Sequence, residues 1–257
     1  MPYEIILTSL IAGILASLAC GLGALPLLFR HIDLEIHSGI AYGFAGGLML
    51  AASVYNLILP GLTMASEGTQ LTNVLPVLAG ILLGSAFLWT TDNYLSEERL
   101  NQASWKRWGG RAEILIFLAM SVHSIPEGVA VGVGYASGEV YSTDLGSYIA
   151  LAIAIHNIPE GLAVAIPMRA AGAGIGKCFI AAFLTSLPQP IAAVPAVLAS
   201  WFFQPIMPLL MGFAAGAMMF LIIMEMIPDA LHHEKPARIA WAMMLGFCLM
   251  LLIQVVL

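Results

Sequence analysis

The feature that most constrains this chain is a series of eight apolar stretches, each long enough to cross a lipid bilayer as a helix. About 20 residues of helix span the hydrocarbon core. The stretches lie near residues 4–28, 39–63, 73–92, 112–135, 146–168, 176–200, 208–228 and 237–257. In lipid only helices and closed barrels satisfy their own backbone hydrogen bonds, and these stretches are too long for barrel strands. We therefore predict an all-α integral membrane protein with eight transmembrane helices, forming one transmembrane domain over residues 1–257.

The basic residues indicate how these helices are oriented. All nine fall in the first, third, fifth and seventh connections, and the other connections contain none. They are Arg30, Arg99, Lys106, Arg107, Arg111, Arg169, Lys177, Lys235 and Arg238. By the positive-inside rule this side faces the cytoplasm, so both termini are expected outside. The sequence shows no organelle signal and no histidine-rich loop, and we expect a multi-pass protein of a prokaryotic cytoplasmic membrane.

A short motif occurs twice, as His123-Ser-Ile-Pro-Glu127-Gly in the fourth stretch and as His156-Asn-Ile-Pro-Glu160-Gly in the fifth. Each copy places an imidazole and a carboxylate four residues apart, on one face of a helix. An ionised carboxylate at this depth costs on the order of 3 kcal/mol, and no Lys or Arg lies at a comparable depth. A cation or a proton is the natural partner, and imidazole nitrogens favour zinc and other first-row transition metals.

Each motif copy also contains a proline, Pro126 or Pro159, directly before its glutamate. Proline lacks an N–H group and clashes with the carbonyl group four residues earlier. We therefore expect both helices to be weakened at this point, with freed carbonyl groups beside the ion site.

Two glycine-rich segments indicate an internal repeat. Gly43-Phe-Ala-Gly-Gly-Leu-Met49 in the second stretch is similar to Gly212-Phe-Ala-Ala-Gly-Ala-Met218 in the seventh. These two stretches run in opposite directions across the membrane, as do the two that carry the histidine motifs. Inverted repeats of this kind are a recurring transporter design. The sequence predicts a 3+2+3 arrangement, with helices 1–3 mirrored by helices 6–8 around helices 4 and 5.

The paired motifs resemble those in the fourth and fifth helices of the ZIP (Zrt/Irt-like) metal transporters, particularly the prokaryotic type, and the resemblance covers the whole chain. It implies a secondary transporter that moves a divalent metal into the cytoplasm, usually zinc, with iron, manganese, cobalt or cadmium as other substrates. It also implies that His123, Glu127, His156 and Glu160 form the first metal position. A methionine of the second helix adds a soft ligand in that family, and Met49 matches it.

The chain departs from the family at a second, adjoining metal position. Many members use the residue after each motif histidine and a glutamate of the sixth helix. Here Ser124, Asn157 and Gln189 stand at these places, and none of them carries a charge. The resemblance therefore implies one strong metal site with a weak or vestigial second position.

A segment with acidic residues and histidines lies at the end of the seventh stretch. It contains Glu225, Asp229, His232, His233 and Glu234. Two interpretations stay open at this point: a solvated helix end, or a cytoplasmic exit site that receives metal released from the midplane.

The remaining sequence features limit cofactors and partners. Cys20, Cys178 and Cys248 are scattered apolar packing residues rather than a disulfide or thiolate site. The glycines before Lys177 lack the spacing of a phosphate-binding loop, so no nucleotide, nucleic acid or resident cofactor is expected. The expected partners are the transported metal ion and the lipid bilayer, and small residues leave a homodimer open.

A carrier is preferred over an enzyme. The main alternative is an intramembrane metal-dependent hydrolase that uses the same His/Glu cluster to activate water. Export instead of import, and a passive channel, are further alternatives.

Overall fold

The computed structural model describes residues 2–28, 34–63, 70–95, 111–141, 145–170, 172–202 and 204–256. Within these ranges all regular structure is helical, as the apolar stretches predict. The longer helices are α1 (Pro2–Leu22), α2 (Leu34–Ala52), α4 (Gln70–Leu95), α6 (Arg111–Tyr141), α7 (Leu145–Ala170), α8 (Ile175–Thr185), α9 (Pro188–Phe202), α10 (Met207–Leu221) and α12 (Pro236–Val256). The shorter elements are η1 (Leu25–Leu28), η2 (Ser53–Ile58), α3 (Leu59–Thr63), η3 (Gln204–Ile206), η4 (Ile222–Met226) and α11 (Ile227–His233).

The described residues contain seven helical segments that are long and apolar enough to cross a membrane, as in a multi-span membrane protein. These segments are Tyr3–Leu28, Gly39–Thr63, Val74–Thr91, Leu145–Ile166, Ile175–Phe202, Met207–His233 and Pro236–Gln254. They coincide with seven of the eight predicted stretches. The other predicted stretch, 112–135, lies within α6, which is a helix of 31 residues.

Neither motif proline interrupts its helix. Helix α6 continues through Pro126, and α7 continues through Pro159. A proline removes only one N–H donor, and helices packed around it hold the remaining turns in place. Irregular backbone occurs in the flanking spans instead: η2 and η4 are π-helical, and Ser186 and Leu187 separate α8 from α9.

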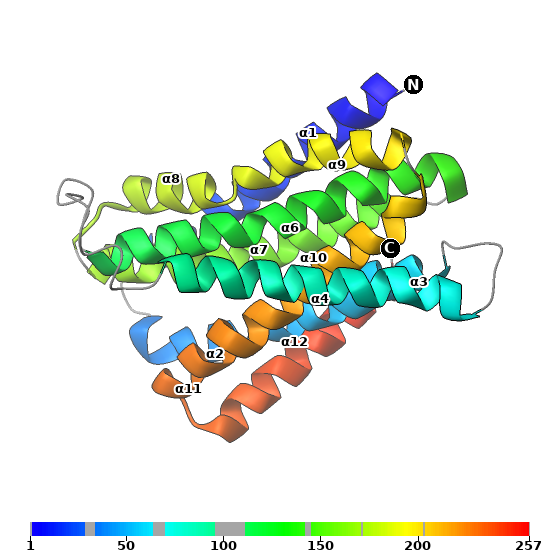
Figure 1. The fold of residues 1–257 in the computed structure, drawn as a ribbon. Helices are drawn as coiled ribbons and strands as arrows, with labels where there is room; N and C mark the ends of the chain where they lie inside the picture. The colour runs from blue at the N-terminus through cyan, green and yellow to red at the C-terminus, as the bar shows by residue number, and fades with distance from the viewer. Residues whose placement is uncertain are drawn as a thin grey trace.

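The central position of α6 and α7 places the histidine motifs in the interior of the bundle. Figure 1 shows both helices running through its middle, with α1, α8 and α9 on one side and α2 and α12 on the other. Helix α7 packs against α1 and α2, and α6 packs against α9 and α10. The two central helices also contact each other, so side chains from both can converge on one point.

Two glycines bring the flanking helices close to the motifs. Gly128 lies so close to α9 that a Cβ atom here would collide with the Gln189 carbonyl oxygen. Gly161 meets the Cys20 carbonyl oxygen of α1 in the same way. Each motif copy therefore packs backbone to backbone against a neighbour, which positions Gln189 of α9 beside Glu127.

Candidate metal centre

Three motif side chains form a compact buried group. Glu127 projects from α6, and His156 and Glu160 project from successive turns of α7. Each offers one ligand atom, and these atoms all lie within 4.8 Å of one another. Their side chains are only 1%, 0% and 4% exposed, so the group is shielded from solvent. Imidazole nitrogen and carboxylate oxygen at this separation match the donor set that zinc and similar metals prefer in proteins.

Helices α6 and α7 are joined within this group by one side-chain contact. His156 Nε2 lies 3.1 Å from Glu127 Oε1. An ionised carboxylate only accepts hydrogen bonds, so a neutral imidazole must carry its proton on Nε2 to make this bond. The other ring nitrogen, Nδ1, then has a lone pair that is available to a ligand.

The group also has polar atoms without a partner. Within the described part of the chain, His156 Nδ1 and Glu160 Oε1 are buried and accept no hydrogen bond. A buried polar atom left in this way costs about 1–3 kcal/mol, and more when it is charged. Two carboxylates so close together also repel each other. One divalent cation bound between them would remove both penalties, because it supplies two positive charges and accepts the free lone pairs.

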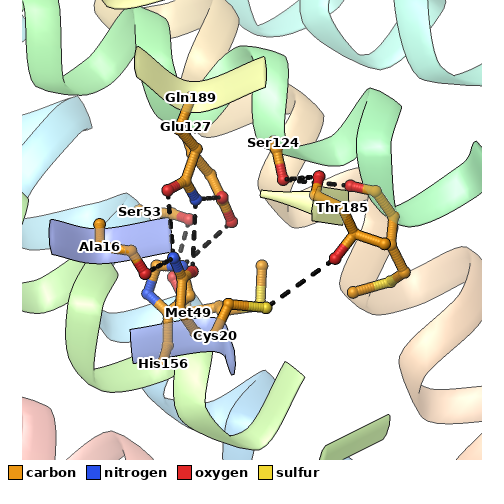
Figure 2. A network of polar contacts seen from close by, with 11 residues as sticks. Ala16, Cys20, Met49, Ser53, Ser124, Glu127, His156, Thr185 and Gln189 are labelled. Carbon is orange, nitrogen blue, oxygen red and sulfur yellow. Dashed lines mark hydrogen bonds and ion pairs between the residues drawn. The ribbon is translucent and has the colours of Figure 1, made fainter. Parts of the chain in front are cut away.

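Gln189 and Asn157, two of the residues predicted for a weak second position, lie beside this group and are fully buried. The Gln189 amide nitrogen donates to Glu127 Oε2, and Asn157 Nδ2 donates to Gln189 Oε1 at 3.1 Å. Asn157 Nδ2 also donates to the Ala16 carbonyl oxygen of α1 at 2.9 Å. Figure 2 shows Gln189 lying directly against Glu127, with His156 and Ala16 in the same network. These hydrogen bonds link α1, α7, α9 and α6.

Ser124, the third residue predicted for the second position, donates to a backbone carbonyl group as Asn157 does. Its hydroxyl group donates to the Thr185 carbonyl oxygen at the end of α8, at 3.0 Å, and to the Met120 carbonyl oxygen at 3.2 Å. Thus both residues that follow a motif histidine donate to a carbonyl oxygen of a flanking helix. Neither hydrogen bond has a side-chain acceptor, so the sequence alone gave no sign of them.

The structure describes the other two predicted ligands only in part. Met49 lies on α2, which packs against α7, and its side chain is fully buried. Its carbonyl oxygen accepts a hydrogen bond from Ser53 at 2.8 Å. His123 lies on α6 one turn before Glu127, but its side chain lies outside the described part of the structure.

The segment predicted as a helix end or an exit site lies apart from this group. Glu225 is half-buried on η4, whereas Asp229, His232 and His233 are exposed on α11. His233 Nδ1 lies 2.8 Å from the Asp229 carbonyl oxygen. Among the described side chains, only Glu127, His156 and Glu160 form a group of three that could share an ion. Both interpretations of the segment therefore stay predictions.

Glu234, which follows α11, is held by the turn into α12. Its carboxylate accepts hydrogen bonds from the Lys235 backbone N–H at 2.9 Å and from Arg238 Nη1 at 3.1 Å. The pKa of this carboxyl lies below its ordinary value, mainly because of the hydrogen bond from the Lys235 backbone N–H. The hydrogen bond from the Arg238 side chain lowers the pKa further. These contacts hold the Glu234 carboxylate at the helix connection.

Asn56 is a buried amide residue to which the sequence analysis assigns no role. Asn56 lies on the π-helical segment η2, and its side chain is 1% exposed. Neither its amide nitrogen nor its amide oxygen has a hydrogen-bond partner in the described part of the chain. The one available signal was its correspondence to Glu225, counted from the shared Gly-Phe-Ala segments.

Comparisons with known proteins agree on one family. The family model described as ZIP Zinc transporter matches residues 98–254, more than half of the chain. The zinc transporter GufA of Myxococcus xanthus is 33% identical over 249 residues, which are 95% of this chain and 97% of that protein. The zinc transporter ZIPB of Bordetella bronchiseptica is 34% identical over 241 residues, 92% of this chain and 77% of that protein. A longer relative from Arabidopsis thaliana is 34% identical over 227 residues, and the chain spans 35% of its length.

Proposed function

The chain belongs to the ZIP zinc transporter family, and we propose that it carries zinc into the cytoplasm through a site between α6 and α7. The observation that carries this proposal is the buried group of Glu127, His156 and Glu160, which lacks a positive partner among the described residues. Membership of a transporter family confirms the prediction of a transporter, not an enzyme, and the hydrolase alternative is set aside.

The ligand set proposed for zinc is larger than the three residues that lie together. His123, one turn before Glu127 on α6, supplies a second imidazole, and Met49 on α2 supplies a thioether. Two imidazoles and two carboxylates suit zinc, while a thioether adds affinity for softer metals such as cadmium. Iron, manganese and cobalt are proposed as further substrates.

We propose eight membrane spans, with α6 as the span beyond the seven candidates, and an inverted repeat. The packing of the helices supports this proposal. If α1, α2, α4 and α6 are exchanged for α9, α10, α12 and α7 in that order, the pattern of helix contacts stays the same. The packing of α4 on α10 becomes that of α12 on α2, and the packing of α1 on α7 becomes that of α9 on α6. The π-helical segments η2 and η4 also follow the two similar Gly-Phe-Ala segments at the same distance.

Close glycine contacts follow the same exchange. A Cβ atom on Gly43 or Gly47 of α2 would press on the Ile239 or Met243 carbonyl oxygen of α12. In the other half, Gly212 and Gly216 of α10 meet the carbonyl oxygens of α4 at Val77 and Ile81. Gly212 and Gly216 each follow their counterparts Gly43 and Gly47 by 169 residues. The contacted carbonyl groups also keep a constant separation, because Ile239 and Met243 each follow Val77 and Ile81 by 162 residues. Such matching of backbone contacts is expected of two copies of one ancestral unit.

The proposed orientation has both termini outside and the basic connections in the cytoplasm. In Figure 1, α1 begins and α12 ends at one end of the bundle, while the start of α8 and the α11–α12 connection lie at the other. Arg169, Lys177, Lys235 and Arg238 belong to these latter connections. Arg30, Arg99, Lys106 and Arg107 lie outside the described residues. The positive-inside rule supports an inward direction for this end.

The proposed transport step is an exchange of ligands. Zinc entering from outside sheds water as Glu127, His156 and Glu160 replace it, and the buried carboxylates lose their mutual repulsion. A relative movement of helix groups then opens the site to the cytoplasm. Glu225, Asp229, His232, His233 and Glu234 at that end are proposed as the place where the released ion is first received.

Uptake of radioactive zinc into proteoliposomes tests this function. We expect saturable uptake by the wild-type protein and loss of at least about 100-fold for Glu127→Ala and His156→Ala, because each removes a buried ligand. Glu4→Ala, an exposed carboxylate at the start of α1, is the matched control and should transport normally. Wild-type vesicles without zinc flux in either direction, or full activity in both site variants, would refute the proposal.

A further inference from the structure

We propose that Gln189 is a positioning residue whose amide group holds Glu127 in place for a single ion and keeps a second cation out. This inference rests on the proposed function, namely that Glu127, His156 and Glu160 bind the transported metal. It assigns Gln189 a role different from the weak ligand that the sequence predicts. Gln189, Asn157 and Glu127 are all essentially buried, so their hydrogen bonds form away from solvent.

The direction of each hydrogen bond in this network is fixed by a backbone carbonyl group. The Ala16 carbonyl oxygen can only accept, so the Asn157 atom 2.9 Å away must be its amide nitrogen. The same nitrogen lies 3.1 Å from Gln189, which must therefore present its oxygen there. The Gln189 nitrogen then has to face the Glu127 carboxylate, which accepts its hydrogen bond. Figure 2 shows this series of contacts from Ala16 to Glu127.

A second cation would have to displace hydrogen bonds at this place. Gln189 donates one N–H group to Glu127 Oε2, and its own oxygen accepts a hydrogen bond from Asn157. The Asn157 oxygen lies 3.4 Å from the Gln189 nitrogen. Ser124 uses its hydroxyl proton on the Thr185 carbonyl group. All three residues of the predicted second position are thus engaged in hydrogen bonds, and none of them brings a carboxylate to a second cation.

The charge balance also favours one ion. Among the described side chains, the buried acidic ones are Glu127 and Glu160, and no buried Lys or Arg accompanies them. One divalent ion neutralises the two carboxylates, whereas a second would leave two uncompensated positive charges in a low-dielectric interior. The Gln189 hydrogen bond supplies, without any added charge, the contact on Glu127 Oε2 that a second cation would otherwise make.

Calorimetric titration of the purified full-length protein with zinc alone tests this role. We expect one zinc ion per wild-type chain. Gln189→Glu keeps the size of the side chain but exchanges the donor for an acidic acceptor, so a second ion should bind. Gln189→Met removes the donor at similar length, so stoichiometry should stay at one while affinity falls about tenfold or more. Ser200→Ala is the matched control, because Ser200 is buried on the same helix and its hydroxyl has no described partner.

Three results would overturn the proposal: two ions per wild-type chain, one ion per chain in Gln189→Glu, or wild-type affinity in Gln189→Met. Stoichiometry separates a positioning role from a merely structural one, because loss of folding lowers the bound fraction without adding a second ion. If the wild-type protein binds no zinc at all, the proposed function fails as well. Zinc binding with an unexpected stoichiometry would instead refute only the role of Gln189.

Discussion

The two copies of the histidine motif share a sequence but have different surroundings. Glu127, in the first copy, is contacted by His156 and by the Gln189 amide group. Glu160, in the second copy, has an oxygen with no hydrogen-bond partner in the described part of the chain. One carboxylate is therefore held by hydrogen bonds, and the other has a buried oxygen without a described partner.

The difference arises from the flanking helices and not from the motifs themselves. Gln189 of α9 lies against Gly128, and Cys20 of α1 lies against Gly161, at places that correspond to each other in the proposed repeat. An amide group can donate a strong hydrogen bond to a carboxylate, whereas a thiol is a weak donor. Cys20 Sγ lies instead 3.9 Å from Thr185 Oγ1. A repeated motif thus sets the geometry of the centre, and single substitutions in its neighbours assign separate roles to the two glutamates.

The largest expected effect concerns zinc binding by the second copy. Glu160→Gln removes the carboxylate that offers a free oxygen, so zinc affinity should fall by about 100-fold or more, as expected for loss of one buried charge partner. The zinc-dependent rise in melting temperature in detergent measures this effect. The melting temperature without metal should fall little, because no described hydrogen bond of Glu160 is lost. Wild-type stabilisation by zinc in this variant would show that Glu160 is not a ligand.

The sequence predicted seven of the helical spans and the shared helix of His156 and Glu160, because both depend on local patterns. Apolar length alone located the spans, and the four-residue spacing brought His156 and Glu160 onto one face of α7. The sequence did not predict the continuity of the helices at Pro126 and Pro159, because packing by neighbours decides whether a proline interrupts a helix.

The amide network was also beyond sequence reasoning. Gln189 stood out because it replaces an acidic residue, but its orientation depends on the Ala16 carbonyl group, which belongs to a distant part of the chain. A backbone carbonyl group leaves no compositional signal. For the same reason the sequence does not reveal that Ser124 donates to the Thr185 carbonyl oxygen.

An effect of intermediate size is expected on the stability of the metal-free protein. Leucine variants of the two glutamates allow a direct comparison. Glu127→Leu leaves the Gln189 N–H group and His156 Nε2 without their acceptor, whereas Glu160→Leu breaks no described hydrogen bond. We expect Glu127→Leu to be less stable than Glu160→Leu by about 1–3 kcal/mol, the cost of orphaned buried donors. Denaturation of both metal-free variants in the same detergent measures the difference. Equal stabilities would mean that Glu127 is not held more firmly than Glu160.

The smallest expected effects concern the residues after the two histidines, Ser124 and Asn157. Asn157→Ser gives the second copy the residue of the first, and it shortens the side chain so that Gln189 loses its described donor. Ser124→Ala removes only the hydrogen bonds to the Thr185 and Met120 carbonyl groups, which costs about 1 kcal/mol of stability. Because Asn157 connects through Gln189 to Glu127 and Ser124 does not, only Asn157→Ser should weaken zinc binding, by several-fold on the scale of one neutral hydrogen bond. Titration of both variants with zinc checks this, and equal affinities would show that orientation of the Gln189 amide group does not depend on Asn157.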